Sequence, residues 1–230
     1  MISLQHQRNA ALTHFMRDMQ AMDFRPARAT FQKDRISLVY PDETRALLYV
    51  NSVKGGFGPG EFGMYIGLTL SNGPVFHVLK KARLAGGSSF PRDLIFRITS
   101  HSLKGGRGLY AFRTAAVESG VKRMVRDARN IYLPLIDDFT IHYKRAAQFI
   151  VDHKGHHARK PFAMVVVLLC LSDALGQLPR WMGRIQTGYF WDLRKTTDYR
   201  TQILKPISRC VNLIHSPKSS PFFRLPRFDS

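Results

Sequence analysis

Residues 36–70 decide the fold, and in order they read ISLVY, PDET, RALLYVNSV, KGGFGPGE and FGMYIGLTL. Three of these segments are rich in β-branched and aromatic residues, which strands favour, and the two between them are typical of turns. In the first segment Ile36, Leu38 and Tyr40 alternate with Ser37 and Val39, so one side of the strand is apolar. The stretch therefore predicts neighbouring strands of an antiparallel sheet with one mostly apolar face.

The segments on either side predict more strands and a helix that leads into them. Residues 5–22 place Leu12, Phe15 and Met19 at helical spacing, which predicts an amphipathic helix that covers the sheet. Residues 75–82 (VFHVLKKA) suit either a strand or a short helix, and the helix is the favoured interpretation. Residues 94–103 (LIFRITSHSL) alternate like a strand. Residues 108–112 (GLYAF) are expected to pair with that strand. This gives four or five strands before residue 113.

The second half of the chain follows the helical period. Val117, Val121 and Met124 recur at helical spacing, and a proline at position 134 is expected to end that helix and begin the next one. In the next helix, Asp137 and Asp138 are expected near the positive end of the helix dipole.

Two later helices are predicted from apolar runs and from the residues that interrupt them. The apolar run of residues 162–175 predicts a buried helix that is closed by Gly176 and Pro179. Residues 197–213 predict a last helix that is broken by Pro206.

These elements predict a fold of the α+β class. The chain has 230 residues and 44% hydrophobic composition, which is enough for a sizeable core. We expect a single α+β domain over residues 1–215, with an antiparallel sheet in its N-terminal half covered by helices from the N-terminus and the C-terminal half. Residues 216–230 combine proline, phenylalanine and arginine, and predict a poorly ordered basic and aromatic tail.

The charge is the most unusual property of the composition. The formal net charge is +19 and the pI is about 10.5, and both halves of the chain contribute to the excess. Polyanions and acidic proteins are therefore the first partners to consider. The longest apolar run, residues 162–171, is about half of the roughly 20 residues that a membrane span needs. We expect no membrane partner and a cytoplasmic location.

Two glycine-rich loops have the residues of phosphate sites. Residues 58–63 spell G-x-G-x-x-G, but they contain a proline and precede a strand, so a hairpin connection is the favoured interpretation over a nucleotide site. In the second loop, Lys104 and Arg107 flank glycines whose amides would suit one phosphate, against the alternative of a turn with solvated charges.

A histidine cluster near residue 155 is the one segment with metal-ligand spacing. His153, His156 and His157 lie close together, but Arg159 and Lys160 add positive charge that opposes a cation. The segment is better suited to an anion, which would bind more strongly as the histidines protonate. We predict no metal and no cofactor.

A basic stripe on the helix after residue 116 completes the set of candidate residues. Cations recur along it while the apolar residues face inward, so phosphates or carboxylates could meet an exposed face, against the alternative that the face is only solvated. The candidates for binding a polyanion are Lys122, Arg123, Arg126, Arg129, Lys104, Arg107, His156, His157, Arg159 and Lys160.

No residues form a convincing catalytic group. Adjacent carboxylates such as Asp137 and Asp138 point about 100° apart on a helix, which does not suit paired acid–base chemistry. Cys170 lies in the apolar run, where burial leaves a thiol inert, and a reducing compartment suits a chain with Cys170 and Cys210 alone. We therefore name no catalytic residues.

Several segments together resemble an uncharacterised bacterial family associated with toxin-immunity neighbourhoods. The resemblance covers roughly residues 10–178 and is carried by the segments MDFRPARATFQ, LLYVNSVKGG, FGMYIGLTL, IYLPLIDDF and PFAMVVVLLCLSDALG. The chain departs from the family at Asp23, where a glycine is usual, and at Asn51-Ser52-Val53, which keeps only part of a polar strand motif. The resemblance implies an α+β domain and a protein-binding role, and it implies no catalytic residues.

The favoured functional hypothesis is a binding protein of the immunity-like or regulatory kind whose basic surface contacts an acidic protein. The alternative is a nucleic-acid-binding protein that uses the helix over residues 115–131 and the C-terminal tail. An enzyme that handles phosphates at the glycine-rich loops ranks third.

Overall fold

The computed structural model describes residues 3–53, 57–82, 84, 94–104, 108–113, 116–194 and 205–215. Its contacts divide the chain into two compact units. The first unit comprises Met1–Pro41, Arg45–Leu70 and Arg97–Ile136, and the second comprises Asp42–Thr44, Ser71–Phe96 and Asp137–Ser230. The expected single domain over residues 1–215 stays a prediction, and the expected tail of residues 216–230 lies outside the described residues.

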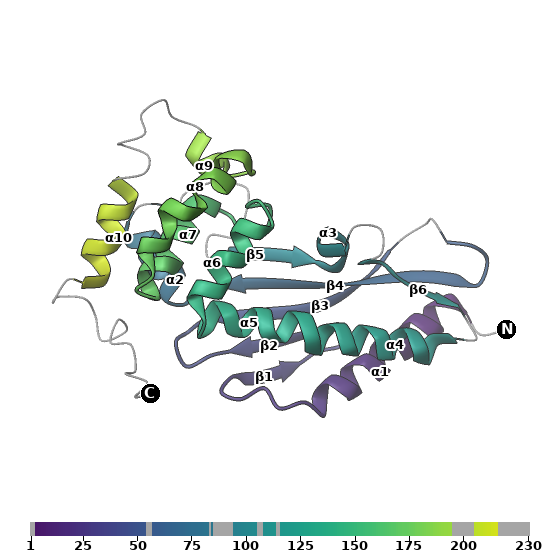
Figure 1. The fold of residues 1–230 in the computed structure, drawn as a ribbon. Helices are drawn as coiled ribbons and strands as arrows, with labels where there is room; N and C mark the ends of the chain where they lie inside the picture. The colour runs from purple at the N-terminus through teal and green to yellow at the C-terminus, as the bar shows by residue number, and fades with distance from the viewer. Residues whose placement is uncertain are drawn as a thin grey trace. The chain divides into compact units, whose positions relative to one another are not determined.

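A six-stranded sheet is the centre of the first unit, and the predicted α+β class is confirmed (Figure 1). The strands are β1 (Arg28–Phe31), β2 (Arg35–Val39), β3 (Arg45–Val53), β4 (Glu61–Ser71), β5 (Leu94–Thr99) and β6 (Tyr110–Arg113). Their order in space is β1-β2-β3-β4-β5, and β6 also pairs with β4. The described chain therefore has one strand more than the largest number expected.

The strands β1 to β3 form an antiparallel meander whose register agrees with the alternation in the sequence. Ile36 lies opposite Leu48, and both are buried, as are Leu38 and Val50 on the same side. Burying this row of aliphatic side chains removes apolar surface from water, which is the main term that stabilises the sheet. β1 was not predicted, because it is only four residues long and alternates between exposed and half-buried positions, with no buried residue to mark an apolar face.

The strand β6 does not pair with β5 as the sequence suggested; it pairs with β4. Its residues lie antiparallel to the start of β4, with Arg113 opposite Glu61 and Tyr110 opposite Met64. The predicted strand over residues 94–103 also ends early, because α3 (Ser100–Lys104) begins at Ser100. The buried Ser100 hydroxyl accepts a hydrogen bond from the Ile66 N–H and donates one to the Gly108 carbonyl. It thereby satisfies the edge of β4 just beyond the segment that β6 covers.

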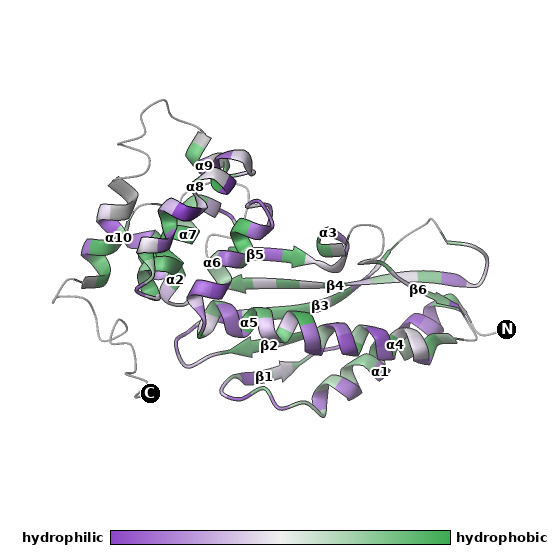
Figure 2. Ribbon diagram, viewed as in Figure 1, coloured by the Kyte–Doolittle hydropathy of each residue, from purple (hydrophilic) through white to green (hydrophobic). Residues whose placement is uncertain are grey.

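Two helices of the first unit lie along one face of the sheet (Figure 1). They are α1 (Leu4–Gln20), which agrees with the prediction for residues 5–22, and α4 (Val117–Asp127). Phe15 and Met19 of α1 and Val121 and Met124 of α4 are buried. In Figure 2 the strands β2 and β3 are mostly hydrophobic, whereas α4 carries hydrophilic residues along its length. The helices therefore bury one apolar stripe and present a polar one.

After α4 the helix widens for one turn before it resumes. The π-helical turn η3 (Ala128–Tyr132) is followed by α5 (Leu133–Thr140), and Pro134 lies in the first turn of α5 as expected. The predicted placement of Asp137 and Asp138 near the positive end of α5 is wrong. They lie in its second half, where the Asp137 carbonyl accepts bonds from the N–H groups of Ile141 and His142. Burial raises the pKa of both carboxyl groups.

The second unit is built around α7 (Pro161–Leu171), whose residues are all buried. The helices α2 (Gly73–Lys81), α6 (Tyr143–Asp152), α8 (Leu178–Thr187), α9 (Trp191–Arg194) and α10 (Lys205–His215) pack against it. A helix that is apolar on every side needs neighbours all round it, which explains why most of the described part of this unit is helical. The short helix predicted over residues 75–82 is confirmed by α2.

The end of α7 differs from the prediction. The helix ends at Leu171, where the Ser172 hydroxyl donates to the Leu168 carbonyl and Asp173 has a φ of 50°. Gly176 lies in the short 3-10 helix η4 (Leu175–Gln177), and Pro179 lies in the first turn of α8, so neither residue closes α7. The helix α10 begins at Lys205, and Pro206 lies in its first turn, where the missing N–H of a proline costs the helix no hydrogen bond. Residues 197–204 of the predicted last helix lie outside the described residues, so the expected break at Pro206 stays a prediction.

The described residues contain no helix that is both long and apolar enough to cross a membrane.

Candidate anion-binding site

The four predicted cations after residue 117 lie together on the first unit. Lys122, Arg123 and Arg126 lie on α4 and Arg129 lies on η3, and all four are exposed. We call these four residues the basic face. The helical period produces it, because Val121 and Met124 turn toward the core while the cations between them turn to solvent.

Two of these four cations have acidic neighbours. The Lys122 Nζ lies 2.8 Å from the Glu118 Oε1 one turn earlier, and this hydrogen bond raises the pKa of Lys122. The Arg126 Nε lies 4.0 Å from the Asp127 Oδ1. The pair of Lys122 and Glu118 is exposed on both sides, so it is weak and opens readily when another anion arrives.

Arg123 and Arg129 form no ion pair with any residue that the structure describes. The Arg123 guanidinium lies 5.5 Å from the centre of the Tyr110 ring, which holds it over an aromatic face. The basic face therefore offers two arginines whose hydrogen-bond donors are not taken up by carboxylates.

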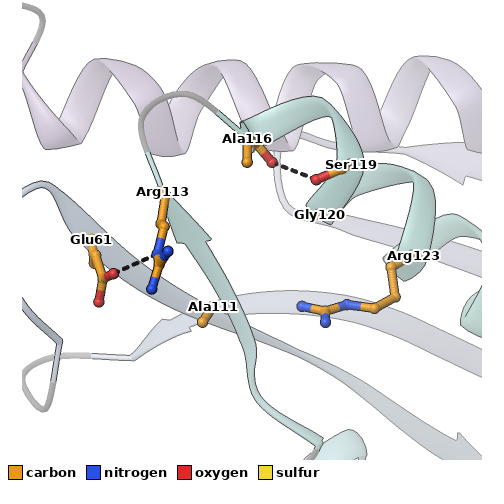
Figure 3. Close-up of a pocket in the computed structure, with 7 residues that line it drawn as sticks. All are labelled: Glu61, Ala111, Arg113, Ala116, Ser119, Gly120 and Arg123. Atoms are coloured by element: carbon orange, nitrogen blue, oxygen red, sulfur yellow. Dashed lines mark hydrogen bonds and ion pairs between the residues drawn. The ribbon is translucent and has the colours of Figure 1, made fainter.

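A cleft of about 450 Å³ lies beside the basic face (Figure 3). It is lined by residues from the start of β4, from β6 and from the first turns of α4: Glu61, Ala111, Arg113, Ala116, Ser119, Gly120 and Arg123. Arg113 enters it from the strand and Arg123 from the helix, so that the two guanidinium groups flank the space over Ala111 (Figure 3). We call this space the β6–α4 cleft.

Glu61 is the acidic residue of the β6–α4 cleft. The register of β4 and β6 places it opposite Arg113, and the Arg113 Nε donates to the Glu61 Oε1 over 2.9 Å. The Glu61 Oε2 accepts a hydrogen bond from the Gly58 N–H over 3.3 Å. Both carboxylate oxygens are therefore occupied, while the side chain of Arg113 remains 80% exposed.

A buried hydrogen bond underlies this site. The Tyr110 hydroxyl on β6 donates to the Asp127 Oδ2 at the end of α4 over 2.7 Å. Burial, together with this bond, raises the pKa of Tyr110, so the hydroxyl keeps its proton at any physiological pH. The bond fixes α4 on the strand and so fixes the ring on which Arg123 lies.

Sequence reasoning missed both Glu61 and Arg113. Only indirect signals for them are present in the sequence: Glu61 follows the glycine-rich turn, and Arg113 is the last residue of a short strand. Only the pairing of β4 with β6, which the sequence did not predict, brings the two side chains together.

The second glycine-rich loop falls mostly outside the described part of the chain. Lys104 ends α3, but the position of its side chain is not described, and Arg107 lies outside the described residues. The hypothesis of a phosphate at this loop stays a prediction.

The first glycine-rich loop is a turn that opens a strand. The Glu61 N–H donates to the Gly58 carbonyl over 3.0 Å, and β4 begins at Glu61. A dinucleotide site of the G-x-G-x-x-G type requires a helix at this point. The favoured interpretation of residues 58–63 as a hairpin connection agrees with the structure, because this turn lies between the neighbouring strands β3 and β4.

The predicted residues near position 155 belong to the second unit. His156 is exposed and stacks on Tyr189, with ring centres 5.3 Å apart and planes 7° apart. His157 is half-buried, and burial, with His153 and His156 nearby, lowers its pKa to about 4. Its imidazole therefore carries no charge near pH 7.

Arg159 and Lys160 follow these histidines in the chain and are half-buried. The Arg159 N–H donates to the Ile95 carbonyl, and Lys160 is the residue before α7. The predicted candidates are thus divided, with the basic face on the first unit and His156 to Lys160 on the second. Among the residues described, no three potential metal ligands come together.

The two cysteines are inert thiols in this fold. Cys170 on α7 and Cys210 on α10 are both buried and unpaired by any disulfide. Burial raises the pKa of Cys170 to about 11 and that of Cys210 to about 12. Neither supplies the thiolate that a nucleophile needs, in agreement with the prediction for Cys170.

None of the family models, curated proteins or solved structures with which we compared the chain matches it. The resemblance to the toxin-immunity-associated family therefore stays a prediction, and the proposals below depend on the residues and their geometry.

Proposed function

We propose that this protein acts by binding an acidic protein, as an immunity-like or regulatory module, and that the basic face is the surface of contact. The observation that supports this most is the pair Arg123 and Arg129, which are exposed on one helical segment without acidic partners among the described residues. A net charge of +19 would attract an acidic partner from a distance, whichever side of the protein it approaches. Contacts with the basic face would then hold the partner in place.

The mixed charge of α4 favours a protein over a nucleic acid. Glu118 is 74% exposed beside Lys122, and it would lie next to any ligand that Lys122 contacts. A phosphate backbone is uniformly negative and is repelled by such a carboxylate, whereas a protein surface also carries cations and N–H donors that can face it.

Nucleic-acid binding is the second candidate. Four cations on one continuous helical segment are the arrangement that contacts successive phosphates without reading the sequence. The tail that would assist, residues 216–230, lies outside the described residues.

One set of variants tests the first proposal. The full chain is used as bait, the captured acidic protein is purified separately, and its affinity is measured by calorimetry with purified components. Lys122→Gln/Arg126→Gln/Arg129→Gln should weaken the complex by about tenfold or more, since interface cations of this kind contribute to both attraction and contact. The control is Arg28→Gln/Lys33→Gln/Lys144→Gln, which removes three exposed cations elsewhere and should weaken it by less than about threefold. Equal losses would refute the basic face as the contact surface.

A second measurement separates the two candidates. A fluorescein-labelled 20-base-pair DNA duplex is titrated with the full chain at several salt concentrations. Nucleic-acid binding predicts that log affinity falls with log salt by about 0.9 for each phosphate contacted, and that the triple variant lowers this slope. Affinity no greater than that of hen lysozyme, an unrelated basic protein, would remove this candidate.

A further inference from the structure

We infer that the β6–α4 cleft is the anchor site for a carboxylate of the acidic partner, an Asp or Glu side chain held between Arg113 and Arg123. The inference rests on the proposed function and names the point of closest contact. It depends on three features of the cleft: two converging guanidinium groups, the room between them, and the balance of charge around them.

The two arginines come from different elements and are each held in place. Arg113 on β6 is held by Glu61 through its Nε, and Arg123 on α4 lies over the ring of Tyr110. Tyr110 is itself fixed by its bond to Asp127. Side chains that are already ordered lose less conformational entropy when a ligand binds, so the pair is preorganised.

Gly120 forms part of the helix side of the cleft, where α4 packs closely on the buried Phe112 of β6. A Cβ built there would lie 2.5 Å from the Phe112 ring, so a larger residue cannot be accommodated without moving that ring. Ser119 does not intrude, because its hydroxyl is bonded to the Ala116 carbonyl over 3.0 Å. The cleft of about 450 Å³ therefore remains accessible to a ligand from solvent.

The donors of both arginines are available. Among the described residues, the contacts of Arg113 use only its Nε, which leaves its two terminal nitrogens for a ligand. Arg123 has no carboxylate partner in the described chain. Guanidinium groups bind carboxylates through paired N–H donors, and such charge-assisted bonds are about twice as strong as neutral ones.

The charge balance favours a carboxylate over a phosphate monoester. Two arginines and Glu61 give the cleft one net positive charge. A carboxylate neutralises that charge, whereas a dianionic phosphate would leave the occupied cleft with one net negative charge and would give up a more strongly held hydration shell on entering it. The occupant is therefore a monoanion of the kind that Asp and Glu provide.

The test uses the full chain and a fluorescein-labelled hexaglutamate peptide, with binding followed by fluorescence anisotropy at low salt. Arg113→Gln/Arg123→Gln should weaken binding by about tenfold or more, because it removes both guanidinium groups. The matched control, Arg28→Gln/Lys33→Gln, removes the same charge from two exposed residues of the first unit outside both the cleft and the basic face, and should cost less than about threefold. Glu61→Gln should tighten binding, since the repelling carboxylate is lost. Equal losses in the two double variants, or no binding of the peptide to the wild-type chain, would overturn the inference.

A variant that keeps the charge separates the cleft from a loss of folding. Arg113→Lys/Arg123→Lys retains both cations but not the paired donors, and it should bind the peptide clearly less well than wild type while melting at the same temperature. Wild-type affinity in this variant would mean that only net charge matters, and would also overturn the inference. Inorganic phosphate should compete less effectively than acetate at equal concentration, and the reverse order would reassign the cleft to phosphate. If Lys122→Gln/Arg126→Gln/Arg129→Gln weakens the complex with the acidic partner and Arg113→Gln/Arg123→Gln does not, the proposed function stands and the cleft inference fails.

Discussion

The hydroxyl of Tyr110 donates a hydrogen bond to the carboxylate of Asp127 over 2.7 Å, and both residues are buried. The bond joins the first residue of β6 to the last residue of α4, so it holds the short strand against the helix. A buried carboxylate needs such donors, because hydrogen bonds from them offset the free energy that it loses on leaving water. The same hydrogen bond therefore stabilises the first unit and fixes the tyrosine ring over which the Arg123 guanidinium lies.

Tyr110→Phe should lower the free energy of unfolding by about 1–3 kcal/mol, because it leaves the buried Asp127 with one donor fewer. Urea denaturation followed by circular dichroism measures this. The control is Tyr65→Phe, whose hydroxyl accepts a bond from the exposed side chain of Asn51, and its cost should stay below about 1 kcal/mol. If the two variants lose the same stability, the buried bond does not have the role we assign to it.

Gly120→Ala should destabilise the protein although alanine is the better helix former. A Cβ at this position would lie 2.5 Å from the Phe112 ring, which is buried and stacked on Phe62 with ring centres 4.8 Å apart. Overpacking of this kind costs about 1–3 kcal/mol. Gly183→Ala on α8 is the matched control, since no atom lies within 4 Å of its Cβ and it should gain up to about 1 kcal/mol. Thermal melts of both variants should therefore shift in opposite directions.

The local part of the fold could be predicted from the sequence, and the distant pairings could not. The alternation through Ile36, Leu38 and Leu48 predicted both the strands and their buried face, because a strand's period is a property of neighbouring residues. Residues 108–112 also looked like a strand, but nothing in their pattern names a partner, and the nearest strand in the sequence was the wrong choice. The end of α7 was misplaced because Ser172 and Asp173, at which the helix ends, are weaker sequence signals for a helix end than Gly176 and Pro179.

The same distinction holds for the candidate site. Lys122, Arg126 and Arg129 were predicted to share a face because their spacings of three and four residues place them there on any helix. Glu61 and Arg113 are 52 residues apart in the chain and meet only through the register of β4 and β6. No periodic pattern connects them.

Asp192→Ala should destabilise the second unit through the start of α7. The two carboxylate oxygens of Asp192 accept hydrogen bonds from the N–H groups of Phe162 and Ala163, each over 3.0 Å, and the side chain of the N-cap residue Lys160 does not itself cap the helix. Losing a helix cap typically costs about 0.5–2 kcal/mol. Asp192→Asn keeps one acceptor oxygen and should lose less, and Asp18→Ala, which removes an exposed ion pair on α1, should lose less than about 1 kcal/mol. The urea midpoints of the three variants are compared to test this role of Asp192. If Asp18→Ala lowered the midpoint most, the proposed capping role of Asp192 would be wrong.

His157→Gln should make the stability of the protein less sensitive to acid. The pKa of His157 in the folded chain is lowered to about 4, chiefly by burial, from an ordinary value of about 6.5. Between those two values the unfolded chain binds a proton that the folded chain does not, so wild-type stability falls as the pH is lowered from about 6.5 toward 4, and no such loss occurs above pH 6.5. The rings of Phe96 and Phe149 and the imidazoles of His153 and His156 surround the side chain, and none of them supplies a negative charge that would reverse this direction. Urea titrations at pH 7.5 and pH 5 should show a smaller difference for the variant than for wild type, and equal differences would show that His157 is not the titrating group.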